Sequence, residues 1–172
     1  RNERVGKPTD IFAVPQSELS EKQLAKSPLM ESDLDFSAPV EPKLPAGTAA
    51  HKASFAEALK MLTALSAGVE KSPRAQHNLA GWKRTIAVKT AGGSLHLQID
   101  DGKFSAGEGL PNGKADFVMI CEDPKLLVEW MTFKEALTNA IIAGRLWISV
   151  NKEFTTIFKL DRLPRSTHRD AK

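Results

Sequence analysis

Between about residue 53 and residue 163, the apolar positions change from a helical period to a strand period. From Phe55 to Val69 they recur every three or four residues, which is typical of a helix with one buried face. Residues 54–57, Ser-Phe-Ala-Glu, form a capping box that satisfies backbone donors at the start of a helix. We therefore expect ordered structure to begin with this helix at Ser54.

Further along, apolar and polar side chains alternate, and glycine-containing turns separate the alternating runs. The predicted strands cover residues 82–89, 95–100, 103–107, 116–121 and 145–150. We expect the first four to form an antiparallel meander with one wet face. Two short helices precede the fifth strand, and a last helix, which includes Phe154 and Phe158, ends before Pro164.

The resulting fold class is α+β: a five-stranded, mainly antiparallel sheet covered by helices. An extended, Pro-rich N-terminal arm precedes it. The predicted division of the chain is an extended or disordered arm at residues 1–52, the domain at 53–163 and a polar C-terminal tail at 164–172.

The arm holds six of the ten prolines, which remove backbone donors and favour extended geometry. A flexible linker fits this composition. Short apolar clusters among the charges instead favour an arm that becomes ordered on a protein partner. The candidate partner-binding residues are Ile11, Phe12, Val14, Leu34 and Phe36.

Composition adds limits on function. The 24 basic and 21 acidic residues leave a formal net charge of +3, with no stretch that concentrates Lys and Arg as a nucleic-acid binder would. No apolar run approaches the roughly 20 residues that span a bilayer, and no signal-peptide pattern opens the chain. We expect a protein of the cytoplasm or an organelle matrix.

Candidate catalytic or metal-binding groups are few. The single cysteine, Cys121, precedes Glu122, whose charge disfavours a thiolate, and we expect a structural thiol. The four histidines show no ligand spacing; they are His51, His77, His96 and His168. The sequence predicts no catalytic residue, no metal and no cofactor, and hence a chain that is not an enzyme by itself.

The order of motifs resembles the sterol carrier protein type-2-like (SCP2) domain family over roughly residues 53–163. The resemblance rests on Asp101-Gly102-Lys103, Ala115-Asp116, the helix start at residues 123–127 and Ala143-Gly144-Arg145-Leu146. Members usually carry a glycine where this chain has Met131-Thr132-Phe133, which places a bulky Phe133 near the expected mouth of a tunnel.

The resemblance implies a sheet and helices around an apolar tunnel that accepts a lipid, an acyl-CoA or an isoprenoid-like molecule. The residues expected to line it are Phe104, Phe117, Met119, Leu127, Trp130, Met131, Ile141, Ile142, Phe154 and Phe158. Ordinary core packing is the alternative role for each of these predicted wall residues.

Two other functions remain open on the sequence alone. The chain could be a structural or accessory subunit of a larger enzyme that docks through the arm. It could also be the C-terminal domain of a multidomain lipid-metabolising enzyme, since it begins at Arg1 without an initiator Met.

Overall fold

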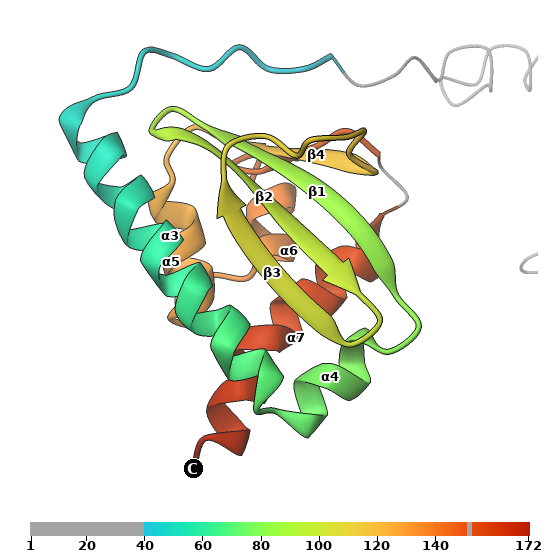
Figure 1. The fold of residues 1–172 in the computed structure, drawn as a ribbon. Helices are drawn as coiled ribbons and strands as arrows, with labels where there is room; N and C mark the ends of the chain where they lie inside the picture. The colour runs from blue at the N-terminus through green and yellow to red at the C-terminus, as the bar shows by residue number, and fades with distance from the viewer. Residues whose placement is uncertain (1–39, 151–152) are drawn as a thin grey trace, which may run out of the picture. The chain divides into compact units, whose positions relative to one another are not determined.

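The computed structural model describes residues 40–150 and 153–172 (Figure 1). The candidate partner-binding residues of the arm lie outside this part of the chain, so their role stays a prediction. The described elements are α3 (Ala49–Glu70), α4 (Pro73–Leu79), β1 (Lys83–Thr90), β2 (Gly93–Asp100), β3 (Lys103–Glu108), β4 (Phe117–Cys121), α5 (Lys125–Met131), α6 (Leu137–Ile142), β5 (Trp147–Ile148) and α7 (Phe154–Asp170).

The five strands form one sheet in the order β3-β2-β1-β4-β5, which confirms the α+β class and the mainly antiparallel sheet. The predicted four-strand meander is wrong at its last strand. β4 crosses over and pairs parallel with β1, with Ile86 opposite Phe117. Four of the five β4 side chains are buried, which suits an inner position, whereas the polar β3 remains at the edge.

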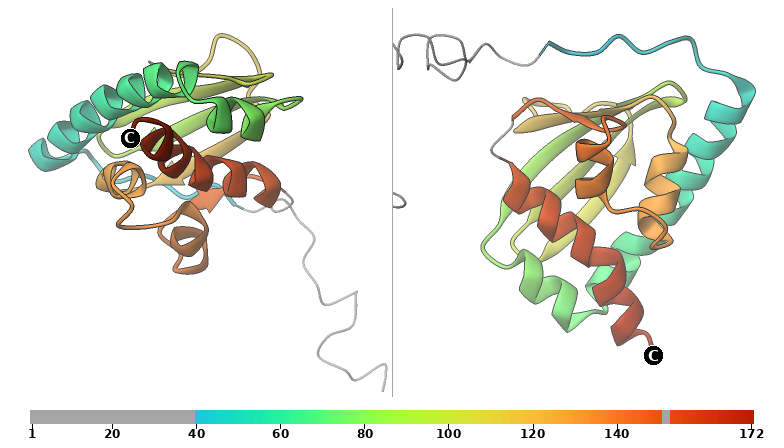
Figure 2. Two further views of the ribbon diagram at one scale, coloured as in Figure 1. Left: turned by 90° about the horizontal axis from the view of Figure 1, so that it is seen from below. Right: turned by 180° about the vertical axis from the view of Figure 1, so that it is seen from behind.

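Alternation along the strands separates a core face from an outer face. Side chains such as Ile86, Leu97 and Phe117 point to the core, and their neighbours Thr85, Gln98 and Val118 share the other face. Helices α5, α6 and α7 cover the core face, and α3 runs along β3 (Figures 1 and 2).

The first described helix begins earlier than the sequence indicated. Thr48, not Ser54, is the N-cap of α3: its hydroxyl accepts a hydrogen bond from the amide of His51 at 3.2 Å. The His51 ring nitrogen Nδ1 accepts in return from the amide of Thr48 at 3.3 Å. The box at Ser54 is therefore inside a helix that has already started.

The last helix also departs from the prediction, because α7 continues through Pro164 to Asp170 where a polar tail was expected. Proline has no amide to donate to the carbonyl four residues before it, that of Leu160. The indole nitrogen of Trp130 donates to this carbonyl instead, at 3.1 Å. The buried acceptor is thereby satisfied, and the helix tolerates its proline.

The segment before α3 lies against the sheet. Glu41 forms an ion pair with Lys89 of β1 at 2.6 Å. Gly47 approaches the β1–β2 turn so closely that a Cβ there would overlap the carbonyl oxygen of Ala91. The division at residue 52 stays a prediction, since most of the expected arm is outside the described residues.

Candidate functional site

The predicted wall residues have different environments. The buried ones are Phe104, Phe117, Met119, Leu127, Trp130 and Met131. Ile141 and Phe154 are partly buried, whereas Ile142 is 78% exposed and Phe158 49% exposed. All six buried residues belong to one continuous core cluster, so their role as ligand walls stays a prediction.

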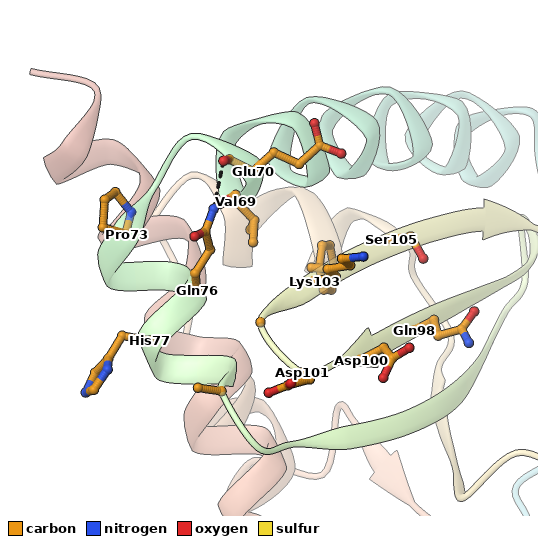
Figure 3. Close-up of a pocket in the computed structure, with 13 residues that line it drawn as sticks. Val69, Glu70, Pro73, Gln76, His77, Gln98, Asp100, Asp101, Lys103 and Ser105 are labelled. Atoms are coloured by element: carbon orange, nitrogen blue, oxygen red, sulfur yellow. Dashed lines mark hydrogen bonds between the residues drawn. The ribbon is translucent and has the colours of Figure 1, made fainter.

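One groove, of about 920 Å³, has a mixed lining of charged, polar and apolar side chains (Figure 3). It lies between the end of α3, helix α4 and the β2–β3 turn, and Phe104 is the one predicted wall residue in it. Glu70, Asp100, Asp101 and Lys103 bring charges to its rim. An alkyl chain gains less against a mixed lining with charges at its rim than against a mainly apolar one, because the gain comes from apolar surface removed from water.

A second groove, of about 560 Å³, is mainly apolar, and we call it the α3–α7 groove. It is lined by one side of α3, the end of α5 with the residues after it, and the last turns of α7. Its lining residues are Met61, Ala64, Leu65, Gly68, Met131, Thr132, Phe133, Pro164, Thr167, His168 and Ala171.

Among the residues of this groove, the sequence analysis named only Met131, as a wall residue of the expected tunnel, and Phe133, as a residue near the mouth of that tunnel. The α3 residues of the groove were not predicted, because an apolar stripe on a helix is most simply interpreted as core packing. Ala64 and Gly68, four residues apart, were the available signal, since small side chains on a helix leave room beside it. The α7 residues were missed because the helix was expected to end before Pro164.

Phe133 occupies a conformation that usually belongs to glycine. Its φ is +64°, and it follows α5 as the left-handed residue of a Schellman motif. Its amide donates to the carbonyl of Trp130 at 3.3 Å, and the amide of Lys134 donates to that of Glu129 at 2.9 Å. Phe133 is one of the three residues, 131–133, among which the resemblance led us to expect a glycine.

Such a conformation costs on the order of 1–2 kcal/mol for a residue with a Cβ. The Phe133 side chain is 42% exposed, and its ring meets that of His168 edge to face, with the centroids 5.4 Å apart. The chain thus keeps a strained aromatic residue at the rim of the α3–α7 groove.

Cys121 is a buried free thiol. Burial first, and then the charge of Asp123, raises the pKa of its thiol to about 12. The neighbouring charge is that of Asp123, not of Glu122 as the sequence suggested. A thiol held neutral in this way is a poor nucleophile and a poor metal ligand at neutral pH.

The histidines of the described chain make separate contacts. His51 caps α3, and the ring nitrogen Nδ1 of His96 lies 2.9 Å from the carbonyl oxygen of Gly109 on the outer face of the sheet. His77 lines the groove of about 920 Å³, and His168 lines the α3–α7 groove. Within residues 40–150 and 153–172, no three His, Cys, Asp or Glu side chains are grouped so as to hold a metal ion.

In fold the chain is similar to sterol carrier protein domains. The sterol carrier protein domain 2 of Helicoverpa armigera is 17% identical over 72% of this chain and 94% of that chain, with a TM-score of 0.48. The UbiJ-SCP2 ubiquinone synthesis protein is 21% identical over 63% of this chain and 96% of its own, with a TM-score of 0.47.

A stereoselective inverting sec-alkylsulfatase from Pseudomonas sp. matches 49% of this chain at 22% identity, with a TM-score of 0.41. That match spans 14% of the sulfatase's own length. No family model matches the chain, and no curated protein does. None of the helices in the described residues is long and apolar enough to cross a bilayer.

Proposed function

We propose that the chain is a non-catalytic module that binds a lipid, an acyl-CoA or an isoprenoid-like molecule, with the hydrocarbon part in the α3–α7 groove. The observation that carries this proposal is the apolar lining of a groove of about 560 Å³. Ligand sites for small molecules commonly have volumes of about 300–1,000 Å³ and mostly apolar walls.

The energetics favour a hydrocarbon occupant. Each buried methylene contributes about 0.8 kcal/mol, so several carbons suffice for measurable affinity without specific polar contacts. Met61 and Met131 both line the groove, from α3 and from the end of α5. Methionine side chains adapt to irregular partners, which fits a ligand class defined by its chain and not by its shape.

The strain at Phe133 supports the same location. Strained backbone persists where the surrounding structure or a function maintains it, and such residues cluster at ligand sites. Glycine would relieve the strain at Phe133, yet the chain presents an aromatic ring there. A bound hydrocarbon would give that ring a contact that the free protein supplies only in part through His168.

A pair of matched variants tests the groove. Ala64 is exposed and lines it, so Ala64→Glu places a carboxylate among the apolar side chains without disturbing the core. Ala56 is also exposed on α3, two turns nearer its start, and is not among the residues that line the groove. Ala56→Glu therefore makes the same change away from the site.

The measurement is displacement of a fluorescent fatty acid by palmitate, palmitoyl-CoA and farnesol. We expect the parent chain and Ala56→Glu to bind the probe, and Ala64→Glu to bind it about tenfold more weakly or worse, since a charge facing hydrocarbon is costly. If the parent chain binds no probe, the proposed function is wrong. If both variants bind equally well, the site lies elsewhere.

A second candidate function is that of an accessory subunit docked through the arm. The position of residues 42–44 favours it, because they line a groove of about 480 Å³ together with Ile120 of β4 and Trp147 of β5. A chain lacking residues 1–39 keeps the Thr48 cap and should stay folded while losing co-purification with its partner. An unchanged assembly would contradict this candidate.

The third alternative is a domain at the end of a lipid-metabolising enzyme. It differs from the other two because it requires a polypeptide longer than this chain. The mass of the intact protein from its natural source decides it. A mass well above 18.8 kDa supports this alternative, and a mass near that value rejects it.

A further inference from the structure

One side of α7 carries two aromatic residues followed by three arginines. Their spacing of four, four, three and four residues places them along a single stripe of the helix. All but the first are exposed, and the first is partly buried. We call this surface the Phe–Arg stripe; it consists of Phe154, Phe158, Arg162, Arg165 and Arg169.

The aromatic part of the stripe is continuous with Phe133. Phe154 and Phe158 have ring centroids 6.1 Å apart. Phe158, Arg162 and Arg165 share a shallow groove of about 270 Å³ with Phe133, and the two phenylalanines are 49% and 42% exposed. Large apolar side chains that are grouped on a surface in this way often mark a site where a protein binds a partner or a membrane.

The two acidic residues of α7 form hydrogen bonds with other helices and no direct ion pair with the arginines of the stripe. The carboxylate of Asp161 accepts hydrogen bonds from the amides of Leu137 and Thr138, at 2.7 and 3.2 Å. The carboxylate of Asp170 accepts from the hydroxyl of Ser72 at 2.6 Å and pairs with Arg74 at 3.1 Å. Both carboxylates are therefore engaged with other helices.

Nearby acidic groups are engaged as well. Glu135, which lines the same shallow groove, pairs with Arg145. Within the described part of the chain, no carboxylate lies within 4.0 Å of a guanidinium of Arg162, Arg165 or Arg169. The three arginines are thus available to an external anion.

We propose that the Phe–Arg stripe, together with Phe133, docks the protein on the surface of an anionic lipid bilayer. Aromatic side chains partition into the headgroup region, and arginines on the same surface attract the phosphates of acidic lipids. The surface of an anionic bilayer offers apolar material for the phenylalanines and phosphates for the arginines side by side. The stripe presents its two kinds of side chain in the same way. A soluble anion would satisfy the arginines but leave the phenylalanines exposed.

This inference goes beyond the proposed function, and it also connects with it. Phe133 borders both the shallow groove of the stripe and the α3–α7 groove. Docking through the stripe would place the rim of the α3–α7 groove at the lipid surface, where a hydrocarbon chain could move between bilayer and protein.

Co-sedimentation of the full chain with vesicles tests the proposal. One set of vesicles is phosphatidylcholine alone, and the other is phosphatidylcholine mixed with phosphatidylglycerol. We expect binding to the mixed vesicles, weakening as salt is added because the attraction is screened. Arg162→Gln with Arg165→Gln should weaken it by about tenfold or more, since each basic residue near the surface contributes about 1 kcal/mol.

The matched control removes two positive charges elsewhere, with Lys52→Gln and Lys114→Gln, both of which are exposed. It should retain most of the vesicle binding. Phe158→Ser should also weaken binding while leaving all charges in place. This variant changes a residue 49% exposed and should fold normally, which circular dichroism checks.

Three results would overturn the proposal. The first is an absence of binding to either kind of vesicle. The second is an equal loss in the stripe variant and the lysine control. The third is a change of oligomeric state in the stripe variants without vesicle binding, which would make the stripe a protein interface. Probe displacement without vesicles is measured separately, so failure of docking and failure of the ligand groove are distinguishable.

Discussion

Aromatic side chains in the interior of the domain and on the surface around Phe133 differ in how far they are buried. In the interior, Phe117 and Trp130 are at most 2% exposed, and the indole nitrogen of Trp130 satisfies the carbonyl of Leu160. At the surface, Phe133 and Phe158 are more than 40% exposed, and Phe133 is held in a left-handed conformation. Stability accounts for the first group but not for the second.

The difference separates two roles that hydrophobicity alone does not. Buried aromatic residues stabilise the fold whether or not a ligand is present. Exposed and strained ones cost free energy in the isolated protein, so a function is the simpler reason for their presence. The proposed ligand groove and the proposed docking stripe both include Phe133.

The largest expected effect is in the interior. Phe117→Ala removes a ring that is 1% exposed and should lower the free energy of unfolding by about 3–5 kcal/mol. Urea denaturation measures it, with Ala64→Glu as the surface comparison, expected within about 0.5 kcal/mol of the parent. A loss under 1 kcal/mol for Phe117→Ala would mean that its surroundings are not a packed core.

Trp130 offers a test of its structural hydrogen bond. Trp130→Phe leaves the Leu160 carbonyl without a donor, and we expect a loss of about 1–3 kcal/mol in unfolding free energy. Trp82→Phe is the control, since its indole donates to the hydroxyl of Thr156 in a partly buried setting and the loss should be smaller. Equal losses would contradict the role given to the Leu160 carbonyl.

Two substitutions at Phe133 separate backbone strain from side-chain contact. Phe133→Gly and Phe133→Ala both remove the ring, but only glycine relieves the positive φ. The glycine variant should be more stable than the alanine variant by about 1 kcal/mol. Both should bind the fatty-acid probe and anionic vesicles more weakly. An alanine variant as stable as the glycine variant would show that Phe133 is not strained.

The smallest expected effect concerns the end of α7. The hydrogen bond from Ser72, followed by the amide and charge of Arg74, lowers the pKa of Asp170. The stabilisation from this carboxylate is therefore complete above its unfolded value of about 3.9 and is lost as pH falls through the lower folded value. Asp170→Asn should destabilise the chain at pH 7 and match the parent in strong acid. A difference that persists in acid would contradict this account.

Much of the fold could be predicted from the sequence, because it depends on local patterns. Alternation identified the strands, and the apolar stripe from Phe55 to Val69 identified α3. The parallel pairing of β4 with β1 could not be predicted from turns, since it depends on which strand is buried on both faces. The continuation of α7 past Pro164 depends on Trp130, which is distant in sequence.

The candidate site could be predicted less completely from the sequence than the fold. Hydrophobic periodicity indicates that a side chain is buried, but it does not distinguish a side chain packed in the core from one that lines a cavity. The role of residues such as Met119 and Leu127 therefore could not be decided from the sequence. The strain at Phe133 had one sequence signal, since the resemblance led us to expect a glycine within residues 131–133. The spacing of the Phe–Arg stripe is present in the sequence. It could be recognised as one face of a helix only once α7 was known to extend to Asp170.

The central claim is that the α3–α7 groove holds a hydrocarbon chain, and native mass spectrometry of the purified 172-residue chain tests it most directly. We expect a population carrying a hydrophobic molecule in the parent chain and in Ala56→Glu, and a strongly reduced one in Ala64→Glu. A parent chain that stays unloaded after incubation with fatty acid, or an Ala64→Glu variant loaded equally well, would contradict it.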